Sequence, residues 1–185
     1  TVRNTKFKGN EAIRGGGIAN RKDAMPTLEG CVFDDNHALY FGGGMYNSQS
    51  SPLIHNSLFL CNTSNAGGGM ANQDQSSPEM TNCTMHGNHA DFGGGIYNDG
   101  SYPVVVNSII WGTGTSSISG TASVSYSNVR GGYSGTANLD TNPLFLGGGD
   151  YHLQPESPCV NQGNDARATL TDLEGRLRQG QVDLG

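Results

Sequence analysis

One unit of about 26 residues recurs in the first part of this chain, and this repeat constrains the fold more than any other feature. Each unit carries a Phe or Met, two asparagines and a run of three glycines, and successive copies lie 25 to 27 residues apart. The recurring positions are Phe7, Phe33, Phe59 and Met85; Asn10, Asn36, Asn62 and Asn88; Asn20, Asn47, Asn72 and Asn98; and the glycine runs that begin at Gly15, Gly42, Gly67 and Gly93. So short and regular a repeat indicates a solenoid in which each unit packs only on its neighbours.

The residues within the unit favour strands over helices. Glycine runs and asparagines interrupt every window of helical length, which excludes solenoids built from helices. Each unit instead holds three short strand-like pieces, separated by Asn and Gly, which take left-handed backbone at turns at low cost. The sequence therefore predicts an all-β parallel β-helix with coils of about 26 residues, three short strands in each coil, and a C-terminal cap.

Stacking of such coils places equivalent residues in columns. We expect one internal column of large apolar residues and a second column of small ones, and ladders of hydrogen-bonded Asn amides at the bends. The two columns are Phe7, Phe33, Phe59, Met85 and Ile110, and Thr5, Cys31, Ser57, Cys83 and Ser108. Most recurrent residues are thus explained by the fold and not by a functional site.

The repeat decays toward the C-terminus. Residues 1–138 are predicted to form the β-helix coils, regular over 1–111 and looser over 112–138. Residues 139–185 contain more charge and less Asn, and we expect them to close the open end of the same domain as a cap.

The charge distribution limits the partners. The net charge is −6, and no Lys or Arg occurs between Asp23 and Val129. Nucleic-acid binding needs a basic stripe to neutralise phosphates, so we expect no nucleic-acid partner. No apolar run is long enough for a membrane span. The spacing of a CxxC zinc site is absent as well, and we expect neither a metal nor a cofactor.

Candidate catalytic groups are few. Glycoside hydrolases need two carboxylates about 5 to 9.5 Å apart, and Asp35 with either Asp34 or Asp91 is the candidate pair. His37 and His89 share a phase two coils apart, and we interpret them as polar turn residues. The sequence therefore assigns no catalytic residue. If the protein is an enzyme, Asp35 and Asp91 are the candidates. The sequence favours a protein that is not an enzyme but leaves the question open.

Two tyrosines are candidate ligand-binding residues. Tyr46 and Tyr97 recur in phase and, if both face outward, stand about 10 Å apart. Aromatic faces at this spacing suit stacking against sugars, although packing on a flat sheet explains them as well. The four cysteines are expected to be free, because Cys31 and Cys83 lie two coils apart, beyond the Cα separation of about 7 Å that a disulfide allows.

The repeated Asn-[Cys/Ser]-x-Phe-x-x-Asn and Gly-Gly-Gly-[Met/Ile]-Tyr-Asn units over residues 1–111 resemble the right-handed parallel β-helix repeats of secreted and cell-surface bacterial proteins. They are similar to the repeats of polymorphic outer-membrane proteins. The tail resembles the segment that closes many such proteins. The stretches that carry this resemblance are Asn138-Leu139-Asp140 to Pro143-Leu144-Phe145, Asp150-Tyr151-His152-Leu153 to Ser157-Pro158, and Asp172-Leu173-Glu174-Gly175 to Val182-Asp183-Leu184-Gly185.

This resemblance implies a right-handed helix and a secreted or cell-surface location in a bacterium. The residues themselves favour a non-catalytic structural or adhesive module with weak glycan binding, because the fold explains the recurrent positions. The partners we expect for it are polysaccharides, other surface proteins or further copies joined end to end or laterally. The alternative is a carbohydrate-active enzyme, either a polysaccharide lyase or a glycoside hydrolase, or its carbohydrate-binding fragment. Lyases on β-helices generally use Lys or Arg to neutralise uronates, and the central coils have neither. The turns between coils are also too short to wall a cleft.

Overall fold

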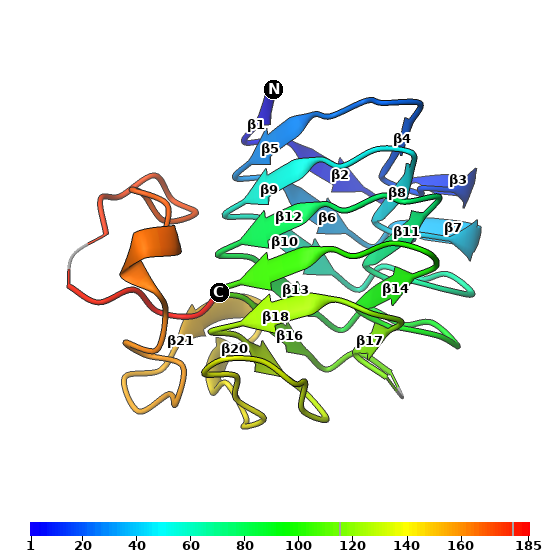
Figure 1. Cartoon of the computed structure of the whole chain (residues 1–185). Helices are drawn as coiled ribbons and strands as arrows, with labels where there is room; N and C mark the ends of the chain where they lie inside the picture. The colour runs from blue at the N-terminus through cyan, green and yellow to red at the C-terminus, as the bar shows by residue number, and fades with distance from the viewer. Residues whose placement is uncertain (115, 179) are drawn as a thin grey trace.

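The computed structural model describes residues 1–114, 116–178 and 180–185, and it shows a right-handed parallel β-helix with about four regular coils (Figure 1). Three parallel sheets run along the stack, with strands from successive coils side by side; the first two have six strands and the third has five. The first sheet comprises β1 (Val2–Arg3), β5 (Thr27–Glu29), β9 (Leu53–His55), β12 (Glu79–Thr81), β15 (Val104–Val106) and β18 (Ser123–Ser125). The second comprises β2 (Lys6–Lys8), β6 (Val32–Asp34), β10 (Leu58–Leu60), β13 (Thr84–His86), β16 (Ile109–Trp111) and β19 (Asn128–Val129). The third comprises β4 (Ile18–Arg21), β8 (Met45–Ser48), β11 (Met70–Gln73), β14 (Ile96–Asn98) and β17 (Ile118–Ser119). The predicted fold class and its three strands per coil are confirmed.

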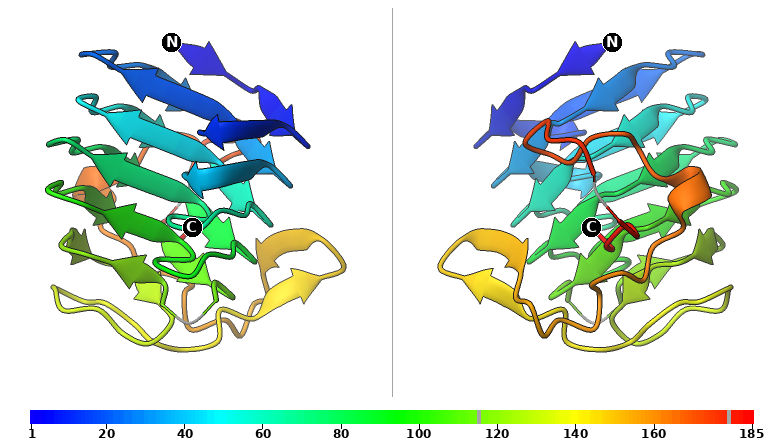
Figure 2. Two further views of the ribbon diagram at one scale, coloured as in Figure 1. Left: turned by 90° about the vertical axis from the view of Figure 1, so that its right-hand side faces the viewer. Right: turned by 90° about the vertical axis from the view of Figure 1, so that its left-hand side faces the viewer.

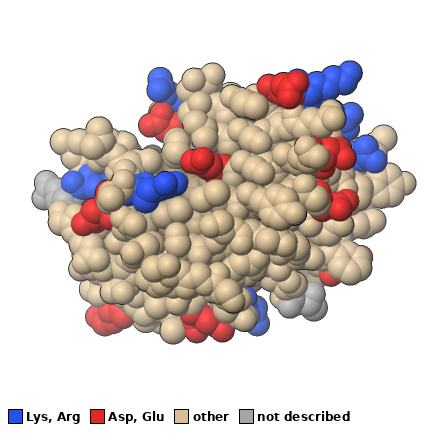
Figure 3. Space-filling model, in the orientation of Figure 1, with Lys and Arg blue, Asp and Glu red and all other residues tan. Residues whose placement is uncertain are grey.

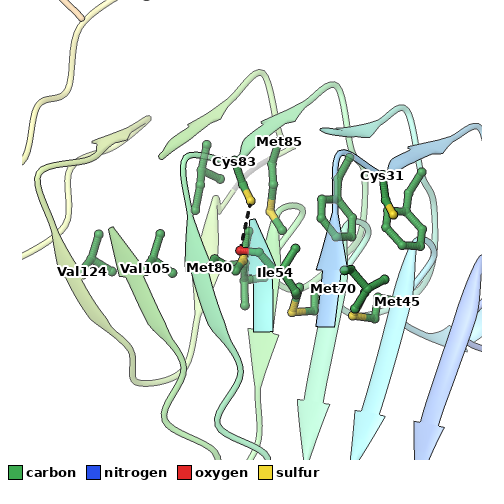
Figure 4. Close-up of a cluster of buried hydrophobic side chains, with 14 of the residues drawn as sticks. Cys31, Met45, Ile54, Met70, Met80, Cys83, Met85, Val105 and Val124 are labelled. Carbon is green, nitrogen blue, oxygen red and sulfur yellow. Dashed lines mark hydrogen bonds between the residues drawn. The ribbon is translucent and has the colours of Figure 1, made fainter. Parts of the chain in front are cut away.

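The interior is a set of stacked apolar columns. Phe33 pairs in register with Phe7 on one side and Phe59 on the other, and the rings of Phe33 and Phe59 stack with centroids 4.5 Å apart. Met85 and Ile110 continue this column, as the repeat predicts. The remaining core is rich in Met, with Met45, Met70 and Met80 all buried around it (Figure 4). Unbranched Met side chains fill the gaps between the columns.

Asparagine amides hold the bends together. In one ladder the Nδ2 of Asn36 donates to the Oδ1 of Asn62 at 2.9 Å, and that of Asn62 donates to Asn88 at 2.9 Å. A second ladder follows the third sheet, where Asn47 donates to Asn72 at 2.8 Å. These side chains are buried, and each one satisfies its neighbour's polar groups in the absence of water. The predicted Asn ladders are confirmed.

The glycine runs allow the coils to approach each other closely. The first glycine of each run has a positive φ, for example +68° at Gly67. A Cβ placed on the second glycine, Gly68, would lie 2.6 Å from the carbonyl oxygen of Gly94 in the next coil. The positive φ at the first glycine and the close backbone contact at the second therefore both favour a residue without a side chain.

All four cysteines are free, as predicted. Cys31, Cys83 and Cys159 are buried, whereas Cys61 is exposed. The Sγ of Cys83 donates to the carbonyl oxygen of Ile54 at 3.6 Å (Figure 4), and complete burial raises the pKa of this thiol to about 12.

A further pairing at the corner before the glycine runs was not predicted. β3 (Glu11–Arg14) and β7 (His37–Phe41) form a parallel pair that protrudes from the stack (Figure 1). The pairing continues as isolated bridges, including Phe41 with Ala66 and Ala66 with Phe92. The stretch between the column residue and the glycine run is one residue longer in the coil that contains β7 than in the other coils. The register of the β3–β7 pair shifts here to accommodate the extra residue.

The C-terminal end of the stack is covered by residues 130–141. Tyr133 packs against the core, and its hydroxyl accepts from the amide of Ala122 at 2.9 Å and donates to the carbonyl oxygen of Gly120 at 3.2 Å. The amide of Leu139 donates to the carbonyl oxygen of Ser127 at 2.9 Å. A partial last coil therefore closes this end.

Residues 139–185 were predicted to cap the end of the stack. Most of this segment instead lies along the side of the stack (Figures 1 and 2). An antiparallel hairpin of β20 (Phe145–Gly147) and β21 (Asp150–Leu153) packs against the second sheet, where the rings of Phe145 and Tyr151 contact His86. The described residues of 159–185, here called the strap, include the 3-10 helix η1 (Asp165–Arg167) and first run back toward the first coil. Residues 180–185 then return to the fifth coil, where the amide of Gly185 donates to the carbonyl oxygen of Asn107 at 2.8 Å.

The strap follows a column of turn asparagines between the first and second sheets. Asn56, Asn82 and Asn107 all have positive φ and are buried. The Nδ2 of Asn56 donates to the carbonyl oxygen of Thr171 at 2.9 Å, and that of Asn107 donates to Asn164 at 3.1 Å. The strap thus supplies acceptors for the buried amides of Asn56 and Asn107, which stabilises its position on the side of the stack.

No helix among the described residues is long and apolar enough to cross a membrane.

Candidate functional site

The structure does not bring the two candidate catalytic carboxylates together. Asp35 lies in a positive-φ turn after β6, and Asp91 lies in the protruding loop two coils further on; both are exposed. Two coils correspond to about 10 Å along the stack, and Asp91 is also displaced by four positions along its coil. This separation exceeds the range of about 5 to 9.5 Å that glycoside hydrolysis needs. Asp34, the other candidate partner of Asp35, forms ion pairs instead: its Oδ2 lies 2.9 Å from the Nζ of Lys6 and 3.0 Å from the Nζ of Lys8.

The two candidate tyrosines have different environments. Both point away from the core, but Tyr46 is only 3% exposed. The guanidinium groups of Arg14 and Arg21 lie over its ring at 5.8 and 5.4 Å, and its hydroxyl donates to Gln73 at 3.0 Å. Tyr97 is half-buried and stacks on Phe41 with centroids 6.1 Å apart. The face of Tyr46 is therefore already occupied, which the in-phase spacing alone did not reveal.

The protruding corner carries an apolar surface, here called the corner ridge and defined by Ile13, Leu39, Tyr40 and Phe92. These side chains are 66%, 50%, 46% and 61% exposed. They all lie in the equivalent loop of coils one, two and four. Ile13, Leu39 and Tyr40 lie in adjacent coils, whereas Phe92 is separated from them by the third coil, which has Ala66 at the paired position. Single exposed apolar residues are ordinary, whereas several on one side indicate a contact surface. The middle of the face in Figure 3 has few charged side chains; they lie at the top and on the left, and also along the right and lower edges.

A second feature is a cavity of about 720 Å³, here called the strap cleft. The floor is the outer face of the second sheet, with Leu58, Thr84 and Ile109. One wall is the hairpin around Asp150–Gln154, and the opposite wall is the strap, with residues 172–174 and Arg178. The cleft therefore exists only because the C-terminal segment folds back along the stack.

A histidine between two carboxylates links the hairpin to the strap. The Nδ1 of His152 lies 2.6 Å from the Oδ1 of Asp150, and its Nε2 lies 3.1 Å from the Oε1 of Glu174. The hydrogen bond to Asp150, followed by the charge of Glu174, raises the pKa of His152 above its ordinary value. The backbone amide and ring of His152 in turn lower the pKa of Asp150.

Arg178 is a half-buried cation beside this cleft. Its Nη2 donates to the Oδ1 of Asn56 and its Nε to the carbonyl oxygen of Thr171, both at 3.3 Å. Burial lowers the pKa of Arg178, although Asp172 and Asp183 act in the opposite direction. No ion pair within 4.0 Å joins it to a carboxylate in the described part of the chain.

We expect the contact between His152 and Glu174 to depend on pH. A group whose pKa is raised in the folded state stabilises that state fully below its unfolded pKa of 6.5 and loses this contribution as the pH rises through the folded pKa. An NMR titration of the His152 ring should therefore give a midpoint above 6.5. Asp150→Asn should lower this midpoint more than Glu174→Gln does, because Asp150 is the larger cause. A midpoint that neither substitution changes would show that the ring does not contact these carboxylates in solution.

The sequence analysis missed both the corner ridge and the strap cleft. The ridge residues occupy the most variable stretch of the repeat, where no column signal exists. The cleft combines residues separated by more than 100 positions, such as Asn56 and Arg178. Its only sequence signal was the higher charge content of residues 139–185. Among the described residues, no group of three or more His, Cys, Asp or Glu side chains is placed to hold a metal ion.

Comparison with known proteins agrees with this architecture. No curated protein and no solved structure matches the chain. The family described as "Right handed beta helix region" matches residues 1–109, which is more than half of the chain. The chain therefore belongs to the right-handed β-helix family.

Proposed function

We propose that this chain is a non-catalytic structural module of a secreted or cell-surface bacterial protein, which supports adhesion or assembly by lateral contact through the corner ridge. The observation that carries this proposal is the row of exposed apolar side chains on a rigid stack. In the coils, the recurrent Asn, Gly and Phe residues are used by the fold itself, in ladders, close approaches and stacked rings.

The geometry of the ridge supports lateral contact. Tyr40 and Phe92 protrude from the same corner of coils two and four and are about half exposed or more. Burial of such side chains contributes about 1.5 to 3 kcal/mol each when they become fully covered. Two rods placed side by side could cover several of them at once.

The test is sedimentation velocity over a wide range of protein concentration. We expect the unmodified chain to associate at high concentration and the double variant Tyr40→Ser with Phe92→Ser to remain monomeric. Tyr102→Ser is the matched control, because Tyr102 is 63% exposed but lies outside the ridge. Equal association of all three proteins would reject the ridge as the contact surface.

The enzymatic alternative is tested separately. The isolated chain is incubated with neutral and acidic polysaccharides, with and without calcium, and the release of reducing ends and unsaturated products is followed. We expect no turnover. Turnover that Asp35→Asn or Asp91→Asn abolishes would replace the structural assignment by a carbohydrate-active enzyme.

A further inference from the structure

Two arginines of the first coil lie together on the surface without a counter-charge, and we propose that they bind a doubly charged phosphate or sulfate group. They are Arg14, the last residue of β3, and Arg21, the last residue of β4. This inference goes beyond the structural role proposed above and does not depend on association through the corner ridge.

The ring of Tyr46 in the second coil brings the two guanidinium groups together. The Cζ atoms of Arg14 and Arg21 lie 5.8 and 5.4 Å from the centroid of this one ring. The first coil has Ala19 at the position that pairs with Tyr46, so no large side chain of that strand covers the ring. Guanidinium groups are attracted to aromatic faces at this distance. Both arginines are exposed, so a ligand can reach them from solvent.

The charges of these two arginines are not neutralised by the protein. Among the described residues, no carboxylate lies within 4.0 Å of Arg14 or Arg21, and Glu11 of the same strand as Arg14 is no exception. Neither guanidinium donates a hydrogen bond to another described residue. The basic side chains of β1 and β2 differ in this respect, because Arg3 pairs with Glu29, and Lys6 and Lys8 pair with Asp34.

This arrangement favours a tetrahedral dianion over other ligands. Two like charges near each other repel, and a bound anion with two charges removes this repulsion. Each guanidinium presents a planar fork of N–H groups that matches the oxygens of an oxyanion. A phosphate ester carries nearly two charges at neutral pH and three acceptor oxygens, enough for both arginines, whereas a carboxylate carries one charge.

The inference is tested by NMR titration of the whole chain at constant ionic strength, in which the Nε–Hε signals of Arg14 and Arg21 are followed. The probes are inorganic phosphate, sulfate and phenyl phosphate, with acetate as the singly charged anion. We expect saturable shifts with phosphate and sulfate, and binding of acetate that is at least about tenfold weaker. Tighter binding of phenyl phosphate than of inorganic phosphate would indicate a group carried by a larger molecule, and equal binding would indicate the free anion.

Arg21→Gln removes one of the two charges, and we expect it to weaken phosphate binding about tenfold. Arg14→Gln should have a similar effect, which keeps the test valid if Arg21→Gln does not fold. Arg130→Gln is the matched control, because it removes the same charge at an exposed position near the other end of the stack.

The proposal is overturned if neither phosphate nor sulfate gives a saturable shift, or if acetate binds as tightly as they do. It is also overturned if Arg130→Gln weakens binding as much as the two other variants. None of these outcomes affects the sedimentation test of the corner ridge, because Tyr40 and Phe92 are unchanged in all three variants.

Discussion

Replacement of Phe59 by alanine is expected to lower the free energy of unfolding by about 3 to 5 kcal/mol. Phe59 is completely buried and lies in register between Phe33 and Met85. Its removal opens a cavity in the middle of the internal column and also removes the ring stacking with Phe33, in which the planes differ by 10°. A denaturant titration measures the loss.

Tyr102→Ala is the control for this prediction. Tyr102 is 63% exposed and lies outside the core, so we expect a change within about 0.5 kcal/mol. If both variants lost the same stability, Phe59 would not be part of a closely packed column.

Replacement of Gly68 by alanine is expected to destabilise the chain by about 3 kcal/mol or more, because it overpacks the contact between two coils. A Cβ at this position would lie 2.6 Å from the carbonyl oxygens of both Gly94 and His89. These atoms belong to the backbone of the adjacent coil, so relief requires the coils to move apart and their parallel hydrogen bonds to lengthen. Thermal and denaturant unfolding both report the effect.

Gly100→Ala separates close approach from backbone strain. Gly100 has a φ of +58°, but a Cβ there would meet nothing within 4 Å. We therefore expect a cost of only about 1 to 2 kcal/mol, from the left-handed backbone alone. A larger loss at Gly100 than at Gly68 would contradict the explanation of the glycine runs by coil-to-coil contact.

The fold could be predicted from the sequence because each structural requirement recurs with the same period. Phe33 and Asn36 each have a counterpart in the adjacent coils, and both sit where the columns require them. The pairing of β3 with β7 was not predicted, because its residues differ from coil to coil. In this loop the coils share a backbone conformation but not a side-chain pattern. A pairing of this kind leaves no periodic signal in the sequence.

The candidate sites were less predictable, because they depend on contacts that do not repeat. The phase of Tyr46 puts it next to Met45, which belongs to the core column, but it does not predict that Tyr46 is only 3% exposed. Its burial arises from Arg14 and Arg21 of the first coil, a coil that carries Ala19 where a tyrosine recurs elsewhere. The strap cleft needs the long-range placement of residues 159–185, and nothing in their composition predicts on which side of the stack they lie.

The strap also changes how the stack can unfold. A solenoid without such a segment has contacts only between adjacent coils, so coils at an end can detach while the others remain folded. Here Thr171 bonds Asn56 across 115 positions, and Asn164 bonds Asn107 across 57. The third and fifth coils are thereby tied to one segment, and neither can open without releasing it. The strap thus couples the third and fifth coils directly, so that a local defect in one of them is transmitted to the other without passing through the layers between.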